Sequence, residues 1–144
     1  MGASPTGPGH EFHQAEAFLN LRLPWSWRLG REFQLQSRLG FSAGWLGDPG
    51  GEACIGTVGP SLLLCRTNLP VSFEGGAGAT GLSRDDFREK DFGELFQFTS
   101  YIGVNLELPA SFRIGYRFQH MSNAGISIHN PGLNLHMLAI SYRF

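Results

Sequence analysis

The sequence predicts an all-β fold, namely one small antiparallel β-barrel of about eight strands over residues 15–144, preceded by a flexible segment at residues 1–14. Three observations favour it. Apolar and polar residues alternate with a period of two along most of the chain, which is typical of strands with one apolar face. Glycine fills 20 of the 144 positions, about twice its usual share of roughly 7%, as expected where tight turns are frequent. Charged residues make up only 16%, against about 25% in soluble domains.

The first half of the domain contains one strongly predicted strand and three weaker ones. Residues 33–45 place a run of apolar side chains on one face: Phe33, Leu35, Leu39, Phe41, Ala43 and Trp45. Weaker patterns predict strands at residues 15–23, 53–65 and 69–80, with glycine and proline turn signals between them. An eighth strand would come from the N-terminus or from a division of residues 15–31. Without it, the barrel would be incomplete at its N-terminal side.

The second half of the domain contains three strongly alternating segments. Residues 92–108, 112–122 and 134–144 each place aromatic and aliphatic side chains on one face and mostly polar side chains on the other. The charged stretch at residues 83–91 predicts a solvated loop before the first of them. An Asn-Pro-Gly turn at residues 130–132 separates the last two. Together with the first half, these segments give seven clear strands.

Two barrel architectures fit this pattern, and the polar faces of the strands distinguish them. In a soluble lipocalin-like barrel the apolar face points inward, whereas in an outer-membrane barrel it points at lipid and the polar face fills the interior. The polar faces mix arginine, glutamate and amide side chains with many small residues, which can pair with one another in a narrow interior. A soluble surface usually carries more lysine, and this chain has only Lys90. The segments are also long enough for a bilayer, which about 9–11 residues cross.

The chain ends in Ser-Tyr-Arg-Phe, with Phe144 on the apolar face. This ending resembles the C-terminal assembly signal of bacterial outer-membrane barrels. The sequence therefore favours a location in the cell outer membrane, although no secretion signal is visible in its first residues. The net charge of −1 gives no electrostatic basis for binding nucleic acid. The histidines are scattered and no cysteine accompanies them, so we expect no metal site.

The strand predicted at residues 112–122 ends in a pair of chemically active side chains. Four apolar residues precede the pair on the same face: Phe112, Ile114, Tyr116 and Phe118. His120 and Ser122 follow on that face, with Cα atoms about 6.6 Å apart. Such a histidine can take the proton of a serine hydroxyl as the serine attacks an ester carbonyl. Asn134, on the same face of the next strand, can hydrogen-bond to the imidazole.

The residues after Ser122 suit the stabilisation of a developing negative charge. Asn123, together with the backbone N–H groups of Ala124 and Gly125, is expected to form an oxyanion hole. The complete motif reads His-Met-Ser-Asn-Ala-Gly at residues 120–125, followed by Asn-Pro-Gly-Leu-Asn at residues 130–134. It resembles the signature of the PagL-type lipid A 3-O-deacylases.

This resemblance covers roughly residues 15–144 and implies a reaction. The family forms eight-stranded outer-membrane barrels that hydrolyse the ester-linked acyl chain at the 3-position of lipid A, without a metal or cofactor. By resemblance, Ser122 is the nucleophile, His120 is the general base and Asn123 contributes to the oxyanion hole. The implied partners are lipid A or lipopolysaccharide as substrate and the outer-membrane bilayer, with a homodimer as one option for the oligomeric state.

The sequence departs from the family pattern at the acid of the site. The family acid is a glutamate, and Asn134 occupies the matching position. Asparagine can orient an imidazole but adds no negative charge, so we expect reduced or lost activity unless another acid, such as Glu94, serves. Two alternatives stay open: a non-catalytic structural outer-membrane barrel and a soluble lipocalin-like carrier of apolar ligands.

Overall fold

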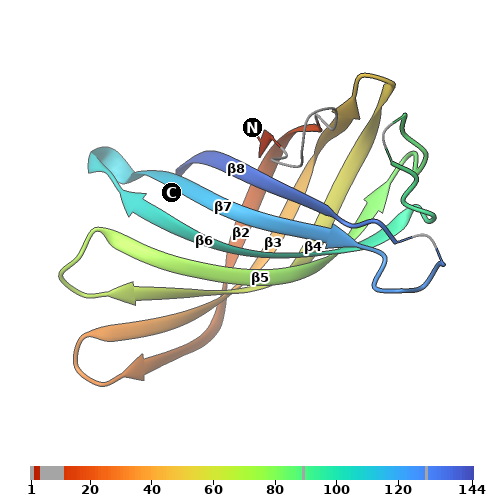
Figure 1. The fold of residues 1–144 in the computed structure, drawn as a ribbon. Coiled ribbons are helices and arrows are strands. Elements are labelled where there is room, and N and C mark those ends of the chain that lie inside the picture. Colours follow the sequence, from red (N-terminus) through yellow and green to blue (C-terminus); the bar gives the residue numbers. More distant parts are fainter. Residues whose placement is uncertain (1, 4–11, 89, 129) are drawn as a thin grey trace.

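The computed structural model describes residues 2–3, 12–88, 90–128 and 130–144, and β-strands dominate it (Figure 1). The seven long strands are β2 (His13–Leu29), β3 (Phe33–Asp48), β4 (Gly51–Arg66), β5 (Val71–Leu82), β6 (Phe96–Glu107), β7 (Phe112–Ser122) and β8 (Leu133–Tyr142). A short 3₁₀ turn, η1 (Pro109–Ser111), links β6 to β7. Among the described residues, no helix has the length and apolar character needed to span a membrane.

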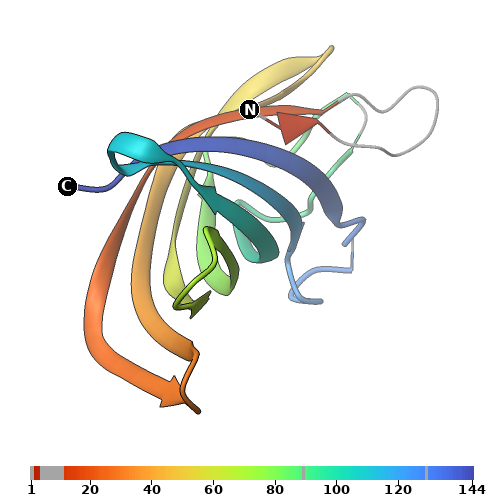
Figure 2. The same ribbon diagram turned by 90° about the vertical axis from the view of Figure 1, so that its left-hand side faces the viewer.

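Each long strand pairs antiparallel with the next one along the chain, and the sheet curls around into a barrel (Figure 2). The two-residue strand β1 (Gly2–Ala3) pairs with both β2 and β8. This short connection closes the ring of strands in the order β1 to β8. The predicted all-β antiparallel barrel is confirmed, and its N-terminal strand is the shortest part of the ring.

The first long strand is longer than predicted. We expected residues 15–23 and considered a division of residues 15–31, but β2 runs without a break across the turn signal at Pro24. Proline has no N–H group to donate to a neighbouring strand, and it is tolerated in strands at bulges. The pairing with β3 accordingly shifts register between Arg22 and Ser26. The strand therefore bends at Pro24 instead of ending there.

The segment between β5 and β6 also differs from its prediction. We expected a solvated loop at residues 83–91 and a strand from residue 92, but β6 begins at Phe96. Phe87 and Phe92 are buried, with ring centroids 5.7 Å apart in an edge-to-face contact, and both pack on the buried Phe12. Burying these rings removes more apolar surface from water than an exposed strand position would. The loop is therefore anchored inside the barrel. The flexible segment expected at residues 1–14 lies largely outside the described residues.

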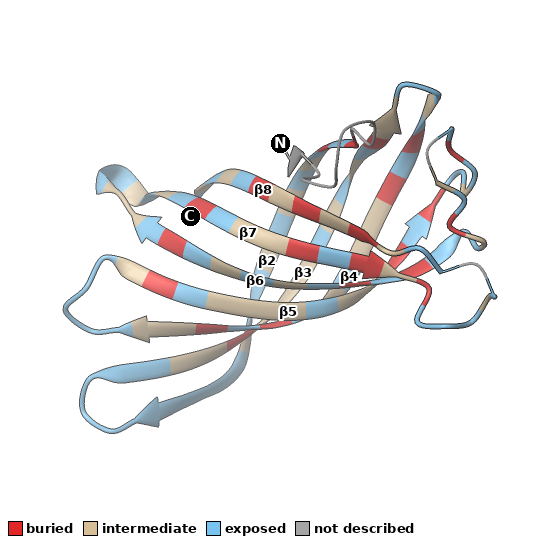
Figure 3. Cartoon of the chain, in the orientation of Figure 1, coloured by how far each residue is buried: buried red, intermediate tan, exposed pale blue. Residues whose placement is uncertain are grey.

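The strand register places alternate side chains outside and inside the barrel, and Figure 3 shows exposed and buried positions alternating along β7 and β8. On the outside, Ile102, Leu138 and Ile140 keep 68%, 65% and 75% of their surface exposed. On the inside, the charged side chains of Arg117 and Glu74 are only 15% and 9% exposed. The apolar face therefore points outward, as the membrane architecture requires.

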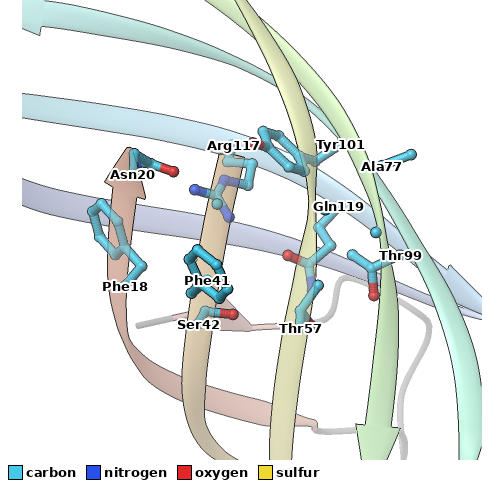
Figure 4. A pocket seen from close by; sticks show the side chains of 13 residues that line it. Phe18, Asn20, Phe41, Ser42, Thr57, Ala77, Thr99, Tyr101, Arg117 and Gln119 are labelled. Atoms are coloured by element: carbon cyan, nitrogen blue, oxygen red, sulfur yellow. The ribbon is translucent and has the colours of Figure 1, made fainter. Parts of the chain in front are cut away.

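Ion pairs fill the middle of the interior. Arg117 lies 3.6 Å from the carboxylate of Glu16 and 3.7 Å from that of Glu74. Arg38 lies 3.8 Å from Glu74. The Arg117 guanidinium also sits 4.2 Å from the centroid of the Tyr101 ring, and Figure 4 shows these two side chains together. Opposite charges thus neutralise one another where water is largely excluded.

A pocket lies beside this network, inside the barrel (Figure 4). Its lining mixes aromatic, amide and hydroxyl side chains, among them Phe18, Asn20, Thr57 and Gln119. Gln119 points into the barrel, so the following residue, His120, points out. The wall of the barrel therefore separates this pocket from the residues that the sequence predicted to be catalytic.

The interior is apolar at the end of the barrel where β7 ends and β8 begins. The buried core there consists of Phe12, Leu46, Ala53, Ile55, Leu82, Phe87, Phe92, Met121, Leu133, Leu135 and Met137. The sequence predicted a polar filling without this apolar layer. Met121 and Leu133 are register partners in the ladder between β7 and β8. Close packing behind these strands fixes the backbone that carries the candidate site.

Candidate active site

His120 and Asn134 face each other across β7 and β8 on the outer surface of the barrel. They are register partners in the antiparallel ladder, and Nδ1 of His120 lies 2.7 Å from Oδ1 of Asn134. Because an amide oxygen only accepts hydrogen bonds, this contact places the hydrogen of the neutral ring on Nδ1. Nε2 is then left unprotonated. An unprotonated Nε2 can accept a proton.

Ser122 is the last residue of β7 and lies on the same outer face as His120. Two residues along a strand separate Cα atoms by about 6.6 Å. Its side chain is half-buried beside its register partner Phe98, and its hydroxyl makes no hydrogen bond to any described residue. The structure thus brings His120, Ser122 and Asn134 together at one place on the outer wall. Their roles in catalysis stay predictions.

Gly132 supports the His120 ring from another side. Its φ of +60° lies in the left-handed region, and a Cβ atom there would lie 3.0 Å from Cε1 and 3.7 Å from Nε2 of the ring. Glycine therefore serves both the backbone turn and the space for the imidazole. The carbonyl oxygen of Gly132 in turn accepts a hydrogen bond from Nζ of Lys90, which comes from the β5–β6 loop.

Lys90 is a part of the site that sequence reasoning missed. Its partial burial lowers the pKa of its ammonium group, because removal from water disfavours the charged form. A lysine in a predicted loop, 42 residues away from Gly132, gave no sequence signal of this contact. The one hint in the sequence that Lys90 has a specific role was that the chain contains no other lysine.

The loop after β7 is held by its own hydrogen bonds. Oδ1 of the fully buried Asn123 accepts from the N–H of Gly125 at 2.9 Å, and Nδ2 donates to the carbonyl of Phe92 at 3.0 Å. The backbone N–H of Asn123 donates to Oδ1 of Asn130 at 3.1 Å. Of the three residues expected to form an oxyanion hole, Ala124 is the one whose N–H donates to no described residue. Asn123 thus shapes the loop that presents this N–H group.

Within the described part of the chain, no carboxylate bonds to the His120 ring. Glu94, which we considered as an alternative acid, lies before β6, where its backbone carbonyl accepts a hydrogen bond from Gln97. Nor does any group of three His, Cys, Asp or Glu side chains gather there that could hold a metal ion. The orientation of His120 therefore depends on Asn134 and on the packing against Gly132.

Comparisons with known proteins identify the family. Residues 13–143 match the family model described as "Lipid A 3-O-deacylase (PagL)". The lipid A deacylase PagL of Bordetella bronchiseptica is 46% identical over 71 residues, which are 49% of this chain and only 40% of that relative's length. The crystal structure of the outer membrane enzyme PagL shares the fold, with a TM-score of 0.83 at 19% identity over 99% of this chain and 97% of that one. Because the family model covers nearly the whole chain, this protein belongs to the lipid A 3-O-deacylase (PagL) family, as the motif at residues 120–134 predicted.

Proposed function

We propose that this protein is an outer-membrane ester hydrolase that removes the 3-O-linked acyl chain of lipid A. Family membership supports this function. The observation that carries it is the 2.7 Å hydrogen bond between His120 and Asn134, beside Ser122 on a largely apolar outer face. Ionisable side chains on a membrane-facing surface are costly and mark functional sites. A barrel with a purely structural role has no need of them there.

The distribution of exposed aromatic side chains supports the location in the outer membrane. Trp25 and Trp27, near the β2–β3 turn, are 60% and 49% exposed, and Trp45, near the β3–β4 turn, is 60% exposed. These turns lie at opposite ends of the barrel. Amphipathic rings at both ends of an apolar band are typical of barrels that cross a bilayer.

The geometry supports attack by Ser122 on an ester carbonyl. As Oγ of Ser122 bonds to the carbonyl carbon, Nε2 of His120 takes the hydroxyl proton, while Asn134 holds Nδ1–H. The N–H of Ala124, within the loop that Asn123 and Gly125 shape, stabilises the oxyanion. Collapse of the tetrahedral intermediate releases the sugar hydroxyl, which receives the proton from His120. Water then cleaves the acyl-serine ester by the same steps and releases a fatty acid.

The position on the outer wall suits a substrate that is itself a membrane lipid. An acyl chain can lie along the apolar stripe of β7, which includes Phe118 and Ile114, while its ester group reaches Ser122 at the end of the strand. The surrounding bilayer then excludes water from the chain, as a pocket does in a soluble esterase.

The test is mass spectrometry of lipid A from bacteria that carry the protein in their outer membrane. The wild type should remove one acyl chain from the 3-position, and Ser122→Ala and His120→Ala should leave lipid A intact. Ser26→Ala, at the opposite end of the barrel, is the control and should behave like the wild type. Full activity of Ser122→Ala would exclude this mechanism.

The asparagine at position 134 favours one second candidate, a barrel of the same fold without turnover. Asn134 lacks the charge that stabilises an imidazolium. In that case neither the wild type nor Asn134→Glu would release a fatty acid from lipid A. Release by Asn134→Glu alone would instead reveal a site that the asparagine weakens.

A further inference from the structure

The hairpin that β2 and β3 form at the end opposite the candidate active site projects away from the rest of the sheet (Figures 1 and 2). All of residues 24–34, the tip of this hairpin, are exposed, although successive positions along a barrel strand normally alternate between the wall and the interior. Figure 3 shows the tip in the colour of exposed residues. Both faces of the tip are therefore open to what surrounds the barrel.

One face of the tip is apolar. Across the hairpin, Trp27 is the register partner of Leu35. Leu29 is the partner of Phe33, and 49% and 42% of their surfaces are exposed. Phe41 lies further along β3 on the same face, because side chains two residues apart share a face. The apolar outer wall of the barrel thus continues onto the tip.

The rest of the tip is cationic. Arg28 lies on the face opposite Trp27, because successive side chains of a strand point to opposite sides, and Arg31 lies in the turn. The carboxylate of Glu32 in the same turn is already paired, since Arg66 of β4 donates to it from Nε at 2.8 Å and also approaches it with a second nitrogen. Among the residues that the structure describes, none forms an ion pair or a hydrogen bond with the guanidinium groups of Arg28 and Arg31.

The two ends of the barrel differ in charge. Residues 22–34 contain three arginines and one glutamate. Residues 83–94, in and around the β5–β6 loop at the end that carries the candidate active site, contain five acidic and three basic side chains. An apolar face next to arginines that lack a carboxylate partner is typical of segments that lie at the level of anionic lipid headgroups. The planar guanidinium group also matches the oxygens of a phosphate.

We propose that the tip of the β2–β3 hairpin is a docking surface for anionic phospholipids, in the leaflet on the side of the membrane away from the candidate active site. The rings of Trp25 and Trp27 lie among the headgroups, while Arg28 and Arg31 bind headgroup phosphates. Zwitterionic phospholipids are held less tightly, because their own ammonium group offsets the phosphate charge. This surface takes no part in ester hydrolysis, so the inference goes beyond the proposed function.

The experiment measures tryptophan fluorescence in lipid vesicles. The chain has three tryptophans, so Trp45→Phe leaves only Trp25 and Trp27 at the tip. The vesicles contain equal amounts of phosphatidylglycerol, which is anionic, and phosphatidylcholine, which is zwitterionic. In each sample one of the two lipids carries bromine atoms, which quench a tryptophan that contacts them. The ratio of the two quenching efficiencies gives the binding constant of phosphatidylglycerol relative to phosphatidylcholine.

In the Trp45→Phe protein this relative constant should be about five, the effect of one arginine near an anionic membrane surface. Arg28→Gln combined with Arg31→Gln should lower it towards one. Sodium chloride at about 0.5 M should also lower it, because salt screens exposed charges. The matched control is Arg84→Gln combined with Arg88→Gln, which removes the same charge from the β5–β6 loop at the other end and should keep the preference.

Three results would overturn the docking surface. They are equal quenching by the two lipids in the Trp45→Phe protein, a preference that the changes at Arg28 and Arg31 leave intact, and quenching by neither lipid, which would place the tip outside the bilayer. The preference is measured before either arginine is changed, so the proposal can be rejected even where a variant fails to fold. Because no ester is cleaved in this measurement, each result leaves the proposed function untouched.

Discussion

Nδ1 of His120 lies 2.7 Å from Oδ1 of Asn134 across one register pair of β7 and β8. The contact fixes the ring and its tautomer through a neutral acceptor. In the proposed mechanism the ring gains a positive charge when it takes the proton of Ser122, and this contact does not offset that charge. The contact therefore orients the proposed general base without giving it electrostatic support. Four substitutions test how the site and its scaffold work.

Replacing Asn134 by glutamate should raise kcat for ester hydrolysis by about tenfold or more, because a carboxylate stabilises the imidazolium that forms in the transition state. The same carboxylate favours the protonated ring, so the acidic limb of the pH–rate profile should move to higher pH. Initial rates measured between about pH 5 and 9 check both effects. Asn134→Leu, which removes the acceptor, should be slower than the wild type; an equal rate would show that the hydrogen bond has no role.

Gly132→Ala should lower kcat about tenfold, because the new Cβ atom would lie 3.0 Å from Cε1 of His120 and displace the ring. Gly30→Ala is the matched control: its φ of +70° is also left-handed, but a Cβ atom there meets no atom within 4 Å. Both changes should cost similar stability, about 1 kcal/mol. Urea unfolding and initial rates on the same samples separate the two effects, and equal loss of activity in both variants would count against the contact with His120.

Lys90→Met should lower kcat severalfold and leave KM nearly unchanged, because the lost hydrogen bond to Gly132 loosens the support of His120 without removing a contact to substrate. Lys90→Arg keeps a charged donor and should recover most of the rate. Steady-state measurements of kcat and KM for the two variants test this role of Lys90. A rise in KM with unchanged kcat would instead assign Lys90 to substrate binding.

Arg117→Leu should lower the free energy of unfolding by about 3–5 kcal/mol, the usual cost of removing one partner from a buried ion pair, because Glu16 and Glu74 would stay buried without it. Arg143→Leu is the control. Arg143 also pairs with a glutamate, at 3.9 Å from Glu107, but its side chain is 70% exposed, and such pairs contribute about 0–1 kcal/mol. Urea unfolding in lipid vesicles measures both; similar losses would show that the interior network does not stabilise the barrel.

Much of the fold could be predicted from local pattern alone. The stripe of β7 that ends in His120 and Ser122 was visible because alternation along a strand needs no knowledge of its neighbours. The facing position of Asn134 followed from the same alternation on the next strand. The break expected at Pro24 was wrong because a bulge lets a strand continue past a proline.

Contacts between loops could not be predicted from the sequence. Phe92 continues the apolar alternation of β6 in the sequence, yet it lies in the core, because tertiary packing with Phe87 overrides the local pattern. Lys90 and Gly132 meet only after β5–β6 and β7–β8 loops have been brought to the same end of the barrel. The hydrogen bonds of Asn123 to Phe92 and Gly125 likewise depend on loop geometry that alternation does not encode.

The most direct test of an activated serine on the outer wall is covalent labelling with a lipid-tailed fluorophosphonate, followed by peptide mass spectrometry. The wild type should carry the phosphonyl group on Ser122. His120→Ala should react far more slowly, and Ser122→Ala should not react at this peptide. Wild-type protein that stays unlabelled at Ser122, or that carries the label on another serine such as Ser100, would contradict the proposed site.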